Sequence, residues 1–454
     1  MHGARMHARD TTTFRAAMRP AARILSSLLL LLLLLCQLPG IVCGVGLRDE
    51  PLLGDALQLL DGLAWTASNN STTIAASVPG DLVTDLQRAG VIGDLLYERN
   101  FKALTWEAEW QYALSFPTAA ALAPAAGGAR WLVLDSIKMG AWIWFNGVYL
   151  GAVQDQFLRW TFDVTALLKA PGAGPNSLAI TFALSNHSLN DQARWTACSG
   201  AWDWAPYTST YNSKGAHTFS KGIVRSAYLI AVGAAAVEHL QTRIFYEGDY
   251  PTAPLTDASA GPWTVVTRVH LRAPAAAAGT VSVRGAWGGS ASAPAALVAG
   301  NNTVELSLSV PAGAVRLWWP NELGVQARYN ITATWTPAAA AAAGPPLATT
   351  RAVGFRVFAL VTGNDTDPAT LKGRDGSDSF TMRWNVNGAK VWSRGANLIP
   401  MDEMEGRLSV DAHVAMLRSA RDAHYNTLRV WGGGSYYHDI VYDTADELGL
   451  MMYQ

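Results

Sequence analysis

Several side chains suited to binding or catalysis lie near the end of the chain, beside two short apolar segments. Asn397 lies in Gly395–Pro400 and Arg429 in Thr427–Val430, and Trp431 is followed directly by Gly432-Gly-Gly434. The guanidinium of Arg429 could hold a neighbouring carboxylate in its ionised form. Trp431 offers a flat apolar face, and the glycines let a ligand approach the backbone closely. The structural alternatives are an internal ion pair for Arg429 and packing against the adjacent loop for Trp431.

Acidic side chains follow the same two segments, and two opposed carboxyl groups can supply an acid and a nucleophile. Those that follow are Asp402, Glu403 and Glu405 after the first segment, and Asp439 and Asp443 after the second. We expect the first three to lie in a solvated surface loop and Asp439 to cap a helix. Asp446 and Glu447 fall near the end of that helix. These residues therefore provide no credible catalytic pair.

Strand and helix patterns alternate around these residues. Ser409 is a plausible N-cap, and Val410, Val414, Leu417 and Ala420 recur at helical spacing. Thr427–Val430 reads as the next strand, Asp439–Leu448 as a second helix ending at Gly449, and Leu450–Tyr453 as the start of a third strand. Such alternation predicts a parallel sheet or a (β/α) barrel, whose chemistry lies at the C-terminal strand ends. Residues 378–454 are too few for a complete barrel, which takes roughly 250, so we expect an incomplete one.

Two β-rich regions precede this unit. The first, residues 52–232, contains short alternating segments such as Trp110–Phe116 and Trp142–Phe145, the latter closed by the hairpin signal Asn146-Gly147. The second, residues 233–362, has strands expected near Trp263–Leu271, Val304–Val310 and Tyr329–Trp335, and its size suits an immunoglobulin-like sandwich. Two alanine-rich stretches, Ala273–Ala278 and Ala338–Gly344, are expected to interrupt its strands. A helix is possible over Ala338–Ala343, but the flanking Pro337 and Gly344-Pro345 favour a surface insertion.

The first 44 residues are predicted to be a signal peptide. Arginines precede the apolar run Ile24–Leu35, which is too short to span a bilayer, and small residues follow at Val42-Cys43-Gly44. An Arg-rich transit peptide is the alternative, although the continuous leucine block argues against it. Met18 would give a signal of more ordinary length, so the true start is left open. We therefore expect the secretory pathway, ending in the lysosome or vacuole or outside the cell, and no membrane span in the mature chain.

The remaining composition limits the classes of partner. Of the three cysteines, only Cys198 lies outside the signal region, which leaves no intrachain disulfide. The formal charge of −1 gives no indication of nucleic-acid binding, and we expect no cofactor and no metal. Glycosylation sequons fit a secretory route and occur at Asn69, Asn70, Asn186, Asn301, Asn330 and Asn364.

Taken in order, motifs from about Leu52 to Gln454 resemble the β-mannosidases of glycoside hydrolase family 2. No single motif is diagnostic, but the ordered set is highly specific. The motifs of the two β regions are Val78-Pro-Gly-Asp81, Tyr97-Glu-Arg-Asn100, Phe145-Asn-Gly147, Trp202-Asp-Trp204, Gly222-Ile-Val-Arg225, Leu317-Trp-Trp-Pro320 and Val353-Gly-Phe-Arg356. Those of the last unit are Trp392–Pro400, Asn426–Gly434 and Asp446–Gly449.

The resemblance implies a multidomain fold: a galactose-binding-like jelly roll (52–232), an immunoglobulin-like sandwich (233–362) and the first part of a (β/α)8 TIM barrel (378–454). It implies retaining removal of terminal β-linked mannose from the non-reducing ends of oligosaccharides. Asn397 and Arg429 would help bind the −1 sugar and Trp431 would face it. Asp203, beside Trp202, would accept hydrogen bonds from the terminal mannose hydroxyls.

Some features depart from the family pattern. Leu398, Tyr437 and Tyr453 stand where the family usually has Trp, Glu and Trp. The family's acid/base glutamate follows its fourth barrel strand and its nucleophilic glutamate lies further on, so both would fall beyond Gln454. We therefore expect the chain to be a fragment without hydrolytic activity, with apolar strand faces exposed by the open barrel. The alternatives are a non-catalytic carbohydrate-binding protein and another family 2 exo-glycosidase of the β-glucosaminidase type.

Overall fold

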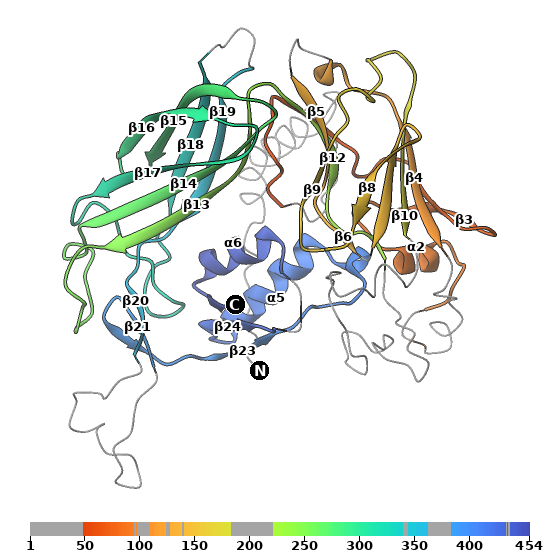
Figure 1. The fold of residues 1–454 in the computed structure, drawn as a ribbon. Helices are drawn as coiled ribbons and strands as arrows, with labels where there is room; N and C mark the ends of the chain where they lie inside the picture. Colours follow the sequence, from red (N-terminus) through yellow and green to blue (C-terminus); the bar gives the residue numbers. More distant parts are fainter. Residues whose placement is uncertain are drawn as a thin grey trace, which may run out of the picture. The chain divides into compact units, whose positions relative to one another are not determined.

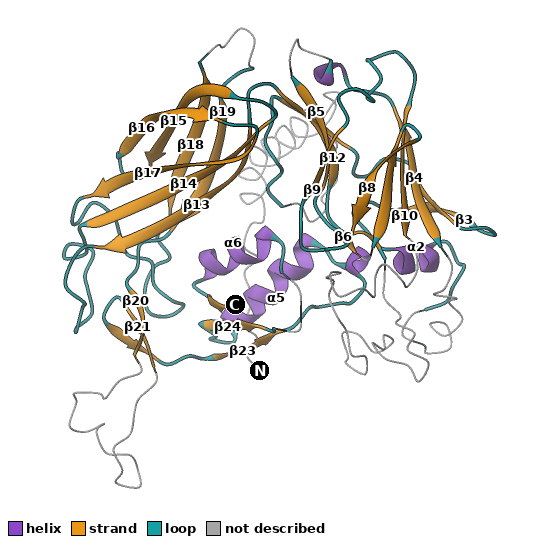
Figure 2. Cartoon of the chain, viewed as in Figure 1, coloured by secondary structure: helices purple, strands orange, loops and turns teal. Residues whose placement is uncertain are grey.

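The computed structural model describes residues 49–94, 97, 109–123, 128–138, 140–182, 221–338, 344–361, 383–432, 434 and 436–454. Strands dominate these ranges, and the longer helices belong to the last part of the chain (Figure 2). Every helix in the described ranges is too short or too polar to span a lipid bilayer. Three parts follow one another along the chain: two antiparallel β-sandwiches and a small parallel β/α unit.

The first sandwich packs a four-stranded sheet, ordered β1-β12-β5-β9, against a six-stranded sheet, ordered β3-β2-β4-β10-β7-β8 (Figure 1). A short pair of strands, β11 and β6, joins them. The strands are β1 Ala56–Leu59, β2 Trp65–Ser68, β3 Thr73–Ala76, β4 Trp110–Phe116, β5 Ala129–Leu134, β6 Ile137–Lys138, β7 Ala141–Phe145, β8 Val148–Val153, β9 Trp160–Asp163, β10 Asn176–Phe182, β11 Gly222–Ile223 and β12 Ala227–Val232. The helices are α2 Leu82–Arg88 and the 3-10 turn η1 Ala120–Leu122.

Alternation of side chains explains how this sandwich forms its core. Along β4, every second residue is buried, and Tyr112 and Phe116 pack into the apolar cluster between the sheets. The predicted hairpin at Asn146-Gly147 is confirmed, since both residues have positive φ between β7 and β8. That geometry suits a two-residue turn and favours Asn-Gly.

The second sandwich packs the sheet β13-β14-β17 against β16-β15-β18-β19. Its strands are β13 Ala236–Tyr246, β14 Trp263–Ala273, β15 Ala277–Gly285, β16 Ser290–Leu297, β17 Gly300–Val310, β18 Tyr329–Pro337 and β19 Leu347–Val353. The three expected strands are present. The first alanine-rich stretch, however, does not form one long loop, because Ala273 ends β14 and Ala277 begins β15. Small side chains do not prevent strand formation here, because β15 pairs with β18 through the backbone and the neighbouring Trp335 supplies the packing.

A three-stranded antiparallel sheet connects the second sandwich to the parallel unit. Its strands are β20 Phe358–Val361, β21 Arg383–Val386 and β22 Ala389–Val391, paired in that order. Asn387 and Gly388 form the turn between β21 and β22, with positive φ at both residues. Asn387 is fully buried and donates its side-chain amide to Trp318 O at 3.0 Å. The β21–β22 hairpin is therefore anchored to the loop between β17 and β18.

The last part of the chain alternates strand and helix as predicted. Its elements are β23 Gly395–Leu398, the 3-10 turn η2 Glu405–Arg407, α5 Val410–Asp422, β24 Thr427–Val430, α6 Asp439–Leu448 and β25 Met451–Tyr453. The three strands are parallel and ordered β23-β24-β25. Ser409 caps α5 by accepting from Ala412 N, as expected, and Gly449 ends α6 in the left-handed conformation.

One residue outside this unit binds the ends of both of its helices. Asn321 donates its side-chain amide to Arg421 O and Tyr425 O, at 3.1 and 2.9 Å, where α5 finishes. Its backbone N–H donates to Gly449 O at 2.8 Å, just past α6. Carbonyls at a helix end lack the N–H that a continuing helix would supply. Arg421 O also accepts from His424 N at 2.9 Å, and the loop of the second sandwich adds further bonds at the ends of α5 and α6.

Candidate functional site

The parallel strands bring Asn397, Arg429 and Tyr453 into one row. Asn397 is the register partner of Arg429, and Arg429 is the partner of Tyr453 on the next strand. Register partners project from the same face of a sheet, and all three residues are exposed. Arg429 Nη1 donates to Asn397 Oδ1 at 3.0 Å. The structure therefore joins two of the sequence-predicted site residues directly and adds Tyr453 beside them.

The opposite face of the three strands is apolar and covered. Leu398, Leu428 and Val430 pack against Leu417 of α5 and Val441 of α6. The exposed face instead carries the polar row, so the expectation of exposed apolar strand faces was wrong. The period-2 alternation of the strands accounts for this, because helices cover one face and leave the hydrogen-bonding side chains on the other.

Trp431 begins the loop after β24 and is half-buried. Its N–H donates to Leu398 O, and its own carbonyl accepts from Gly434 N, both at 3.0 Å. A side chain at Gly434 would press on the ring of Pro400, because an added Cβ would lie 3.0 Å from Pro400 Cδ. The loop is thus held tightly to the end of β23, which fixes where the indole can lie.

The acidic residues after β23 and β24 have structural partners. Asp402 accepts from Met404 N at 2.8 Å and pairs with Arg407 at 3.0 Å. Glu405 accepts from Gln156 Nε2 at 2.9 Å. Asp439 accepts from Glu50 N at 2.9 Å. Each of these carboxylates has a partner that fixes local structure, which agrees with the conclusion that they form no catalytic pair.

Asp439 does not cap its helix. It is the first residue of α6, and the N-cap position, His438, makes no side-chain capping bond. The cap comes from far away in the sequence: Asp49 accepts from Asp439 N at 2.8 Å. Burial alone would raise the pKa of Asp49, but the ring of His438, whose Nδ1 lies 3.4 Å from Asp49 Oδ2, and the charge of Arg225 offset this and lower it. A helix N-terminus favours such a carboxylate.

Glu403 is not solvated, contrary to the expectation for its loop. Its side chain is buried beside Lys138 of β6, whose Nζ donates to Glu403 O at 3.2 Å and to Oε1 at 3.3 Å. Lys138 Nζ also lies 3.8 Å from Glu405 Oε1. Asp81, which caps α2, reaches the same loop by accepting from Gly406 N at 2.7 Å. The loop after β23 is therefore anchored on the first sandwich through charged groups.

One ammonium faces three carboxylates in this cluster, and the pKa values follow from that. Burial tends to lower the pKa of Lys138, but the charges of Glu403, Glu405 and Asp81 overcome this and raise it. Burial raises the pKa of Glu403, which Lys138 only partly offsets because Glu405 and Asp81 compete for the same cation. Lys138 therefore stays protonated. When the pH falls, the carboxylates of the cluster take up the additional proton.

Two of the three residues that differ from the family pattern lie on the side of the parallel sheet that α5 and α6 cover. Leu398 and Tyr437 are buried in the apolar cluster of α5 and α6. Burial raises the pKa of Tyr437 above its usual value. Its hydroxyl and Glu403 Oε2 have no hydrogen-bond partner among the described residues, and both residues line a small cavity of about 40 Å³. Tyr453, the third departure, is exposed in the polar row.

Other candidate residues are separated from the row or fall outside the described ranges. Trp202 and Asp203 lie outside the described residues, as do the sequons at Asn186 and Asn364. Asn70, Asn301 and Asn330 are exposed, whereas the Asn69 side chain accepts from Ser71 N and Thr72 N within its turn. Asn330 also lines a large open groove of about 720 Å³ between β18, β19 and α6.

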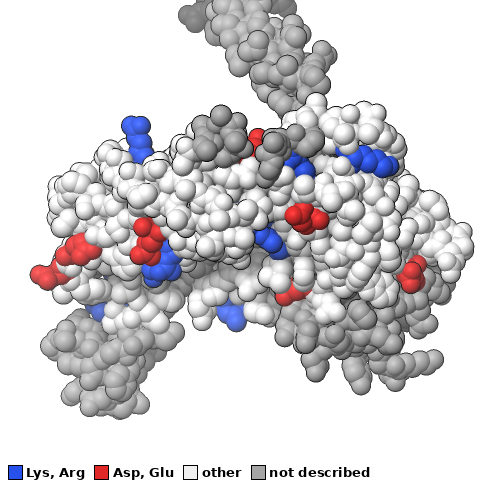
Figure 3. Space-filling view, turned by 45° about the horizontal axis from the view of Figure 1, so that its top comes forward, with Lys and Arg blue, Asp and Glu red and all other residues white. Residues whose placement is uncertain are grey.

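Charge is spread evenly over the visible surface. On the face shown in Figure 3, basic and acidic side chains occur singly or in small mixed groups. No broad patch of one sign appears among the described residues of that face.

The comparisons with known proteins agree with this architecture. Residues 65–212 match the family model described as "Glycosyl hydrolase 2 galactose-binding domain-like", within the first sandwich region. The resemblance to glycoside hydrolase family 2 is thereby confirmed. Its curated relatives include the β-mannosidase of Rattus norvegicus, 27% identical over 91% of this chain and 46% of the relative. β-Mannosidase A of Emericella nidulans is 26% identical over 87% of this chain and 43% of the relative.

Solved structures show the same fold. A β-D-mannosidase from Dictyoglomus thermophilum matches with a TM-score of 0.69 at 22% identity, covering 88% of this chain and 47% of that one. An exo-chitosanase from Amycolatopsis orientalis matches with a TM-score of 0.64 at 18% identity, over 87% and 43%. The chain spans less than half the length of each of these relatives.

Proposed function

We propose that this chain is the amino-terminal part of a β-mannosidase-type exo-glycosidase, which removes terminal non-reducing β-D-mannose from oligosaccharides and glycoproteins. In this proposal residues 1–44 are a signal peptide, 52–232 a jelly roll, 233–362 an immunoglobulin-like sandwich and 378–454 the beginning of a TIM barrel. The protein enters the secretory pathway and acts in a lysosome or vacuole or outside the cell. The named β-mannosidase relatives support this activity.

The hydrogen-bonded pair of Asn397 and Arg429 carries the proposal. The pair lies near the C-terminal ends of neighbouring parallel strands, where barrel enzymes place their chemistry. The amide of Asn397 would bind a hydroxyl of the −1 sugar. The charge of Arg429 would keep a nucleophilic carboxylate ionised beside the anomeric carbon. Trp431 would stack on the sugar ring, while Asp203 and Trp202 would bind the terminal mannose and prevent binding of longer chains beyond it.

The two catalytic glutamates are proposed to lie outside these 454 residues. A retaining mechanism needs two carboxyl groups about 5–5.5 Å apart, one to protonate the leaving oxygen and one to attack the anomeric carbon. Four of the described carboxylates after β23 and β24 support this, because Asp402, Glu403, Glu405 and Asp439 have structural partners. The 454-residue chain should therefore hold substrate contacts without completing the reaction.

A second candidate within the same class is an exo-β-glucosaminidase. The structural similarity to an exo-chitosanase supports this second candidate. The two differ at the C2 substituent of the sugar, which is a hydroxyl in mannose and an amino group in glucosamine. Parallel assays with aryl β-D-mannoside and aryl β-D-glucosaminide separate them. A non-catalytic carbohydrate-binding protein is the alternative outside the enzymes.

The decisive experiment begins with the transcript downstream of Gln454. The proposal expects an open frame that continues the barrel and includes an Asn-Glu pair. The protein encoded by that frame should hydrolyse an aryl β-D-mannoside, and the 454-residue chain should not. In the longer protein, Arg429→Ala should lower kcat/KM by roughly 10²- to 10³-fold, by analogy with the loss of a transition-state donor.

The matched control is Arg421→Ala. Arg421 is an exposed arginine of α5 whose side chain bonds Asp422, and its replacement should leave kcat/KM unchanged. A stop codon after Gln454 in independent transcripts would favour the binding protein instead. Turnover by the 454-residue chain that disappears in Asp203→Ala would contradict the placement of the catalytic glutamates.

A further inference from the structure

The outer face of the six-stranded sheet carries two continuous rows of side chains. Strand pairing places Ala75, Thr66, Ala113, Ala179, Trp144 and Tyr149 in one row, from β3 across to β8. The adjacent row contains Thr73, Ser68, Gln111, Thr181, Trp142 and Ala152. On β4 and β7 these residues alternate with the buried positions, so they project away from the core. Thr181 of β10 belongs to the same face by its pairing, but it is buried. None of these side chains carries a charge.

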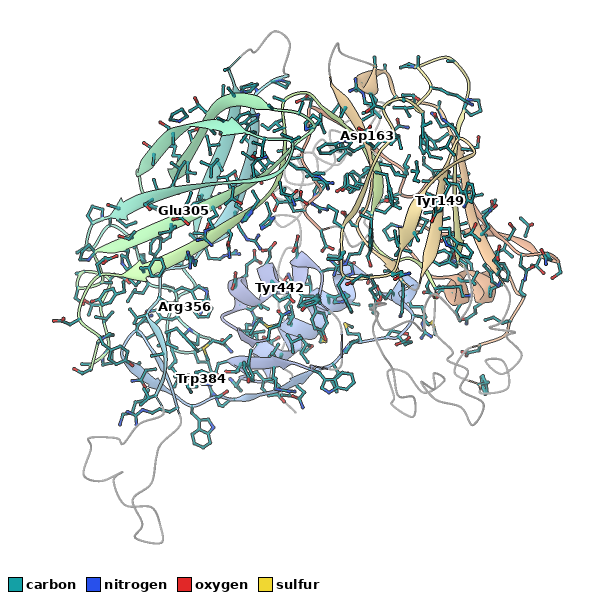
Figure 4. All side chains as sticks on the ribbon, viewed as in Figure 1. Tyr149, Asp163, Glu305, Arg356, Trp384 and Tyr442 are labelled. Atoms are coloured by element: carbon teal, nitrogen blue, oxygen red, sulfur yellow. The ribbon has the colours of Figure 1, made fainter. Side chains whose placement is uncertain are left out.

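Aromatic rings form one end of this face. Trp144 and Tyr149 are 40% and 48% exposed, with ring centroids 5.1 Å apart and planes inclined at 52°. Trp142 occupies the neighbouring position of the second row and is half-buried. Figure 4 marks Tyr149 on β8, the edge strand of the sheet. Large aromatic side chains left exposed together on a surface indicate an interaction site rather than a packing role.

Small and hydroxylated side chains form the rest of the face. Ala113 and Ala179 lie next to Trp144 and leave a low floor beside its ring. Gln111 Nε2 donates to Thr181 Oγ1 at 3.1 Å. That bond orients the Gln111 side chain, whose amide oxygen remains an acceptor, and Thr66 and Ser68 add hydroxyl groups on β2. The face thus combines exposed aromatic rings on β7 and β8 with a floor of small and hydroxylated side chains on β2, β4 and β10.

We propose that this face binds a neutral oligosaccharide without cleaving it. The C–H surface of a pyranose ring would lie on Trp144 and Tyr149, and its hydroxyl groups would bond to Gln111, Thr66 and Ser68. The absence of charge across both rows matches an uncharged, hydroxylated ligand and offers nothing to an anionic one. A second copy of the chain fits less well, because the hydroxyl-lined floor would lose its water without gaining apolar contact.

This site is independent of the proposed hydrolytic activity. It lies on the first sandwich, whereas Asn397 and Arg429 lie on β23 and β24. Neither row contains a carboxylate that could act on a glycosidic bond. The face would hold a glycan chain near the enzyme, and it would do so equally in a protein with no catalytic residues.

Binding of the 454-residue chain to β-1,4-linked mannohexaose, measured by calorimetry, tests the proposal. Trp144→Ala/Tyr149→Ala should weaken the affinity roughly tenfold or more, because it removes both stacking surfaces. Ala179→Glu should also weaken it, since it fills the floor and adds a charge. Polygalacturonate, an anionic polymer, should not bind more tightly than a neutral glucomannan.

Matched variants keep the test specific. Phe245→Ala removes another exposed aromatic ring, on β13 of the second sandwich, and should leave the affinity unchanged. Any affinity that remains in Trp144→Ala/Tyr149→Ala and is lost in Asn397→Ala/Arg429→Ala belongs to the proposed active site, which keeps the two sites distinguishable. Unaltered binding by Trp144→Ala/Tyr149→Ala would overturn the proposal. So would a wild-type dimer in sedimentation that dissociates in that variant and binds no oligosaccharide.

Discussion

The Asn397–Arg429–Tyr453 row and the Lys138–Glu403 pair both depend on the segment that contains β23 and its following loop. The row is exposed on one face of three strands, and its hydrogen bond joins residues of the same small unit. The pair is almost fully buried and joins that loop to β6 of the first sandwich. Polar side chains a few positions apart in the sequence therefore have opposite surroundings.

This difference shows how burial separates a binding role from a structural one. An exposed amide and guanidinium exchange water for a ligand at little cost, and their loss leaves no buried charge. A buried ammonium and carboxylate must satisfy each other, since each has lost its water. We therefore expect replacements in the pair to change folding and replacements in the row to change ligand binding.

The largest effect is expected for Lys138→Met. This change leaves Glu403 and the nearby Glu405 without their cation, and breaking a buried pair from one side costs about 3–5 kcal/mol. Urea unfolding at neutral pH measures the change in the free energy of unfolding. The double variant Lys138→Met/Glu403→Leu should recover part of the loss. A cost below about 1 kcal/mol for Lys138→Met would show that the pair is not buried as described.

The pH dependence of stability should come next. Because the pKa of Glu403 is raised in the folded state, the folded protein binds this proton more tightly than the unfolded chain does. Its contribution to stability is fully present below the ordinary carboxyl pKa of 4.5 and is lost as the pH rises through the folded value. Glu403→Gln should make the profile of unfolding free energy flatter between acidic and neutral pH.

Other titrating groups near Glu403 also contribute to the pH dependence of the unfolding free energy. Lys138, Glu405 and Asp81 face it directly, and His413 lines the same small cavity. Burial lowers the pKa of His413, which opposes the trend in acid. Glu305→Gln is the matched control, because Glu305 is exposed on β17 and pairs with Arg268 (Figure 4). An unchanged slope in Glu403→Gln would contradict the assignment.

The smallest effect on stability is expected in the row. Arg429→Ala should change the free energy of unfolding by less than about 0.5 kcal/mol, as is usual for exposed substitutions. Urea unfolding of Arg429→Ala and Asn397→Ala checks this under the same conditions as Lys138→Met. A loss of 2 kcal/mol or more would mean that the row is a structural ion-pair site, and would weaken its proposed role with substrate.

Local patterns predicted several of the elements. Several strands of the two sandwiches, the turn at Asn146, the cap at Ser409 and the stop at Gly449 follow from alternation, turn chemistry and capping. The Asn397–Arg429 contact could also be expected, since parallel strands align their ends. These features depend on residues close in sequence or on simple register.

Two of the wrong expectations concern partners that are distant in sequence. Glu403 was expected in solvent because its own loop is charged, and nothing local indicates Lys138. Asp439 was expected to cap its own helix, whereas Asp49 supplies the cap. In both cases the competing residue comes from the first part of the chain. Its position depends on how the parts pack, which propensity and periodicity do not encode.

The binding of Asn321 to both helix ends has a kinetic consequence. For α5 or α6 to open locally, the carbonyls of Arg421, Tyr425 and Gly449 must lose their bonds to a residue of another part of the chain. Local opening is therefore coupled to the loop of the second sandwich, and the two should behave as one cooperative unit in native-state hydrogen exchange. The amides of α5 and α6 should then exchange only as fast as that loop detaches.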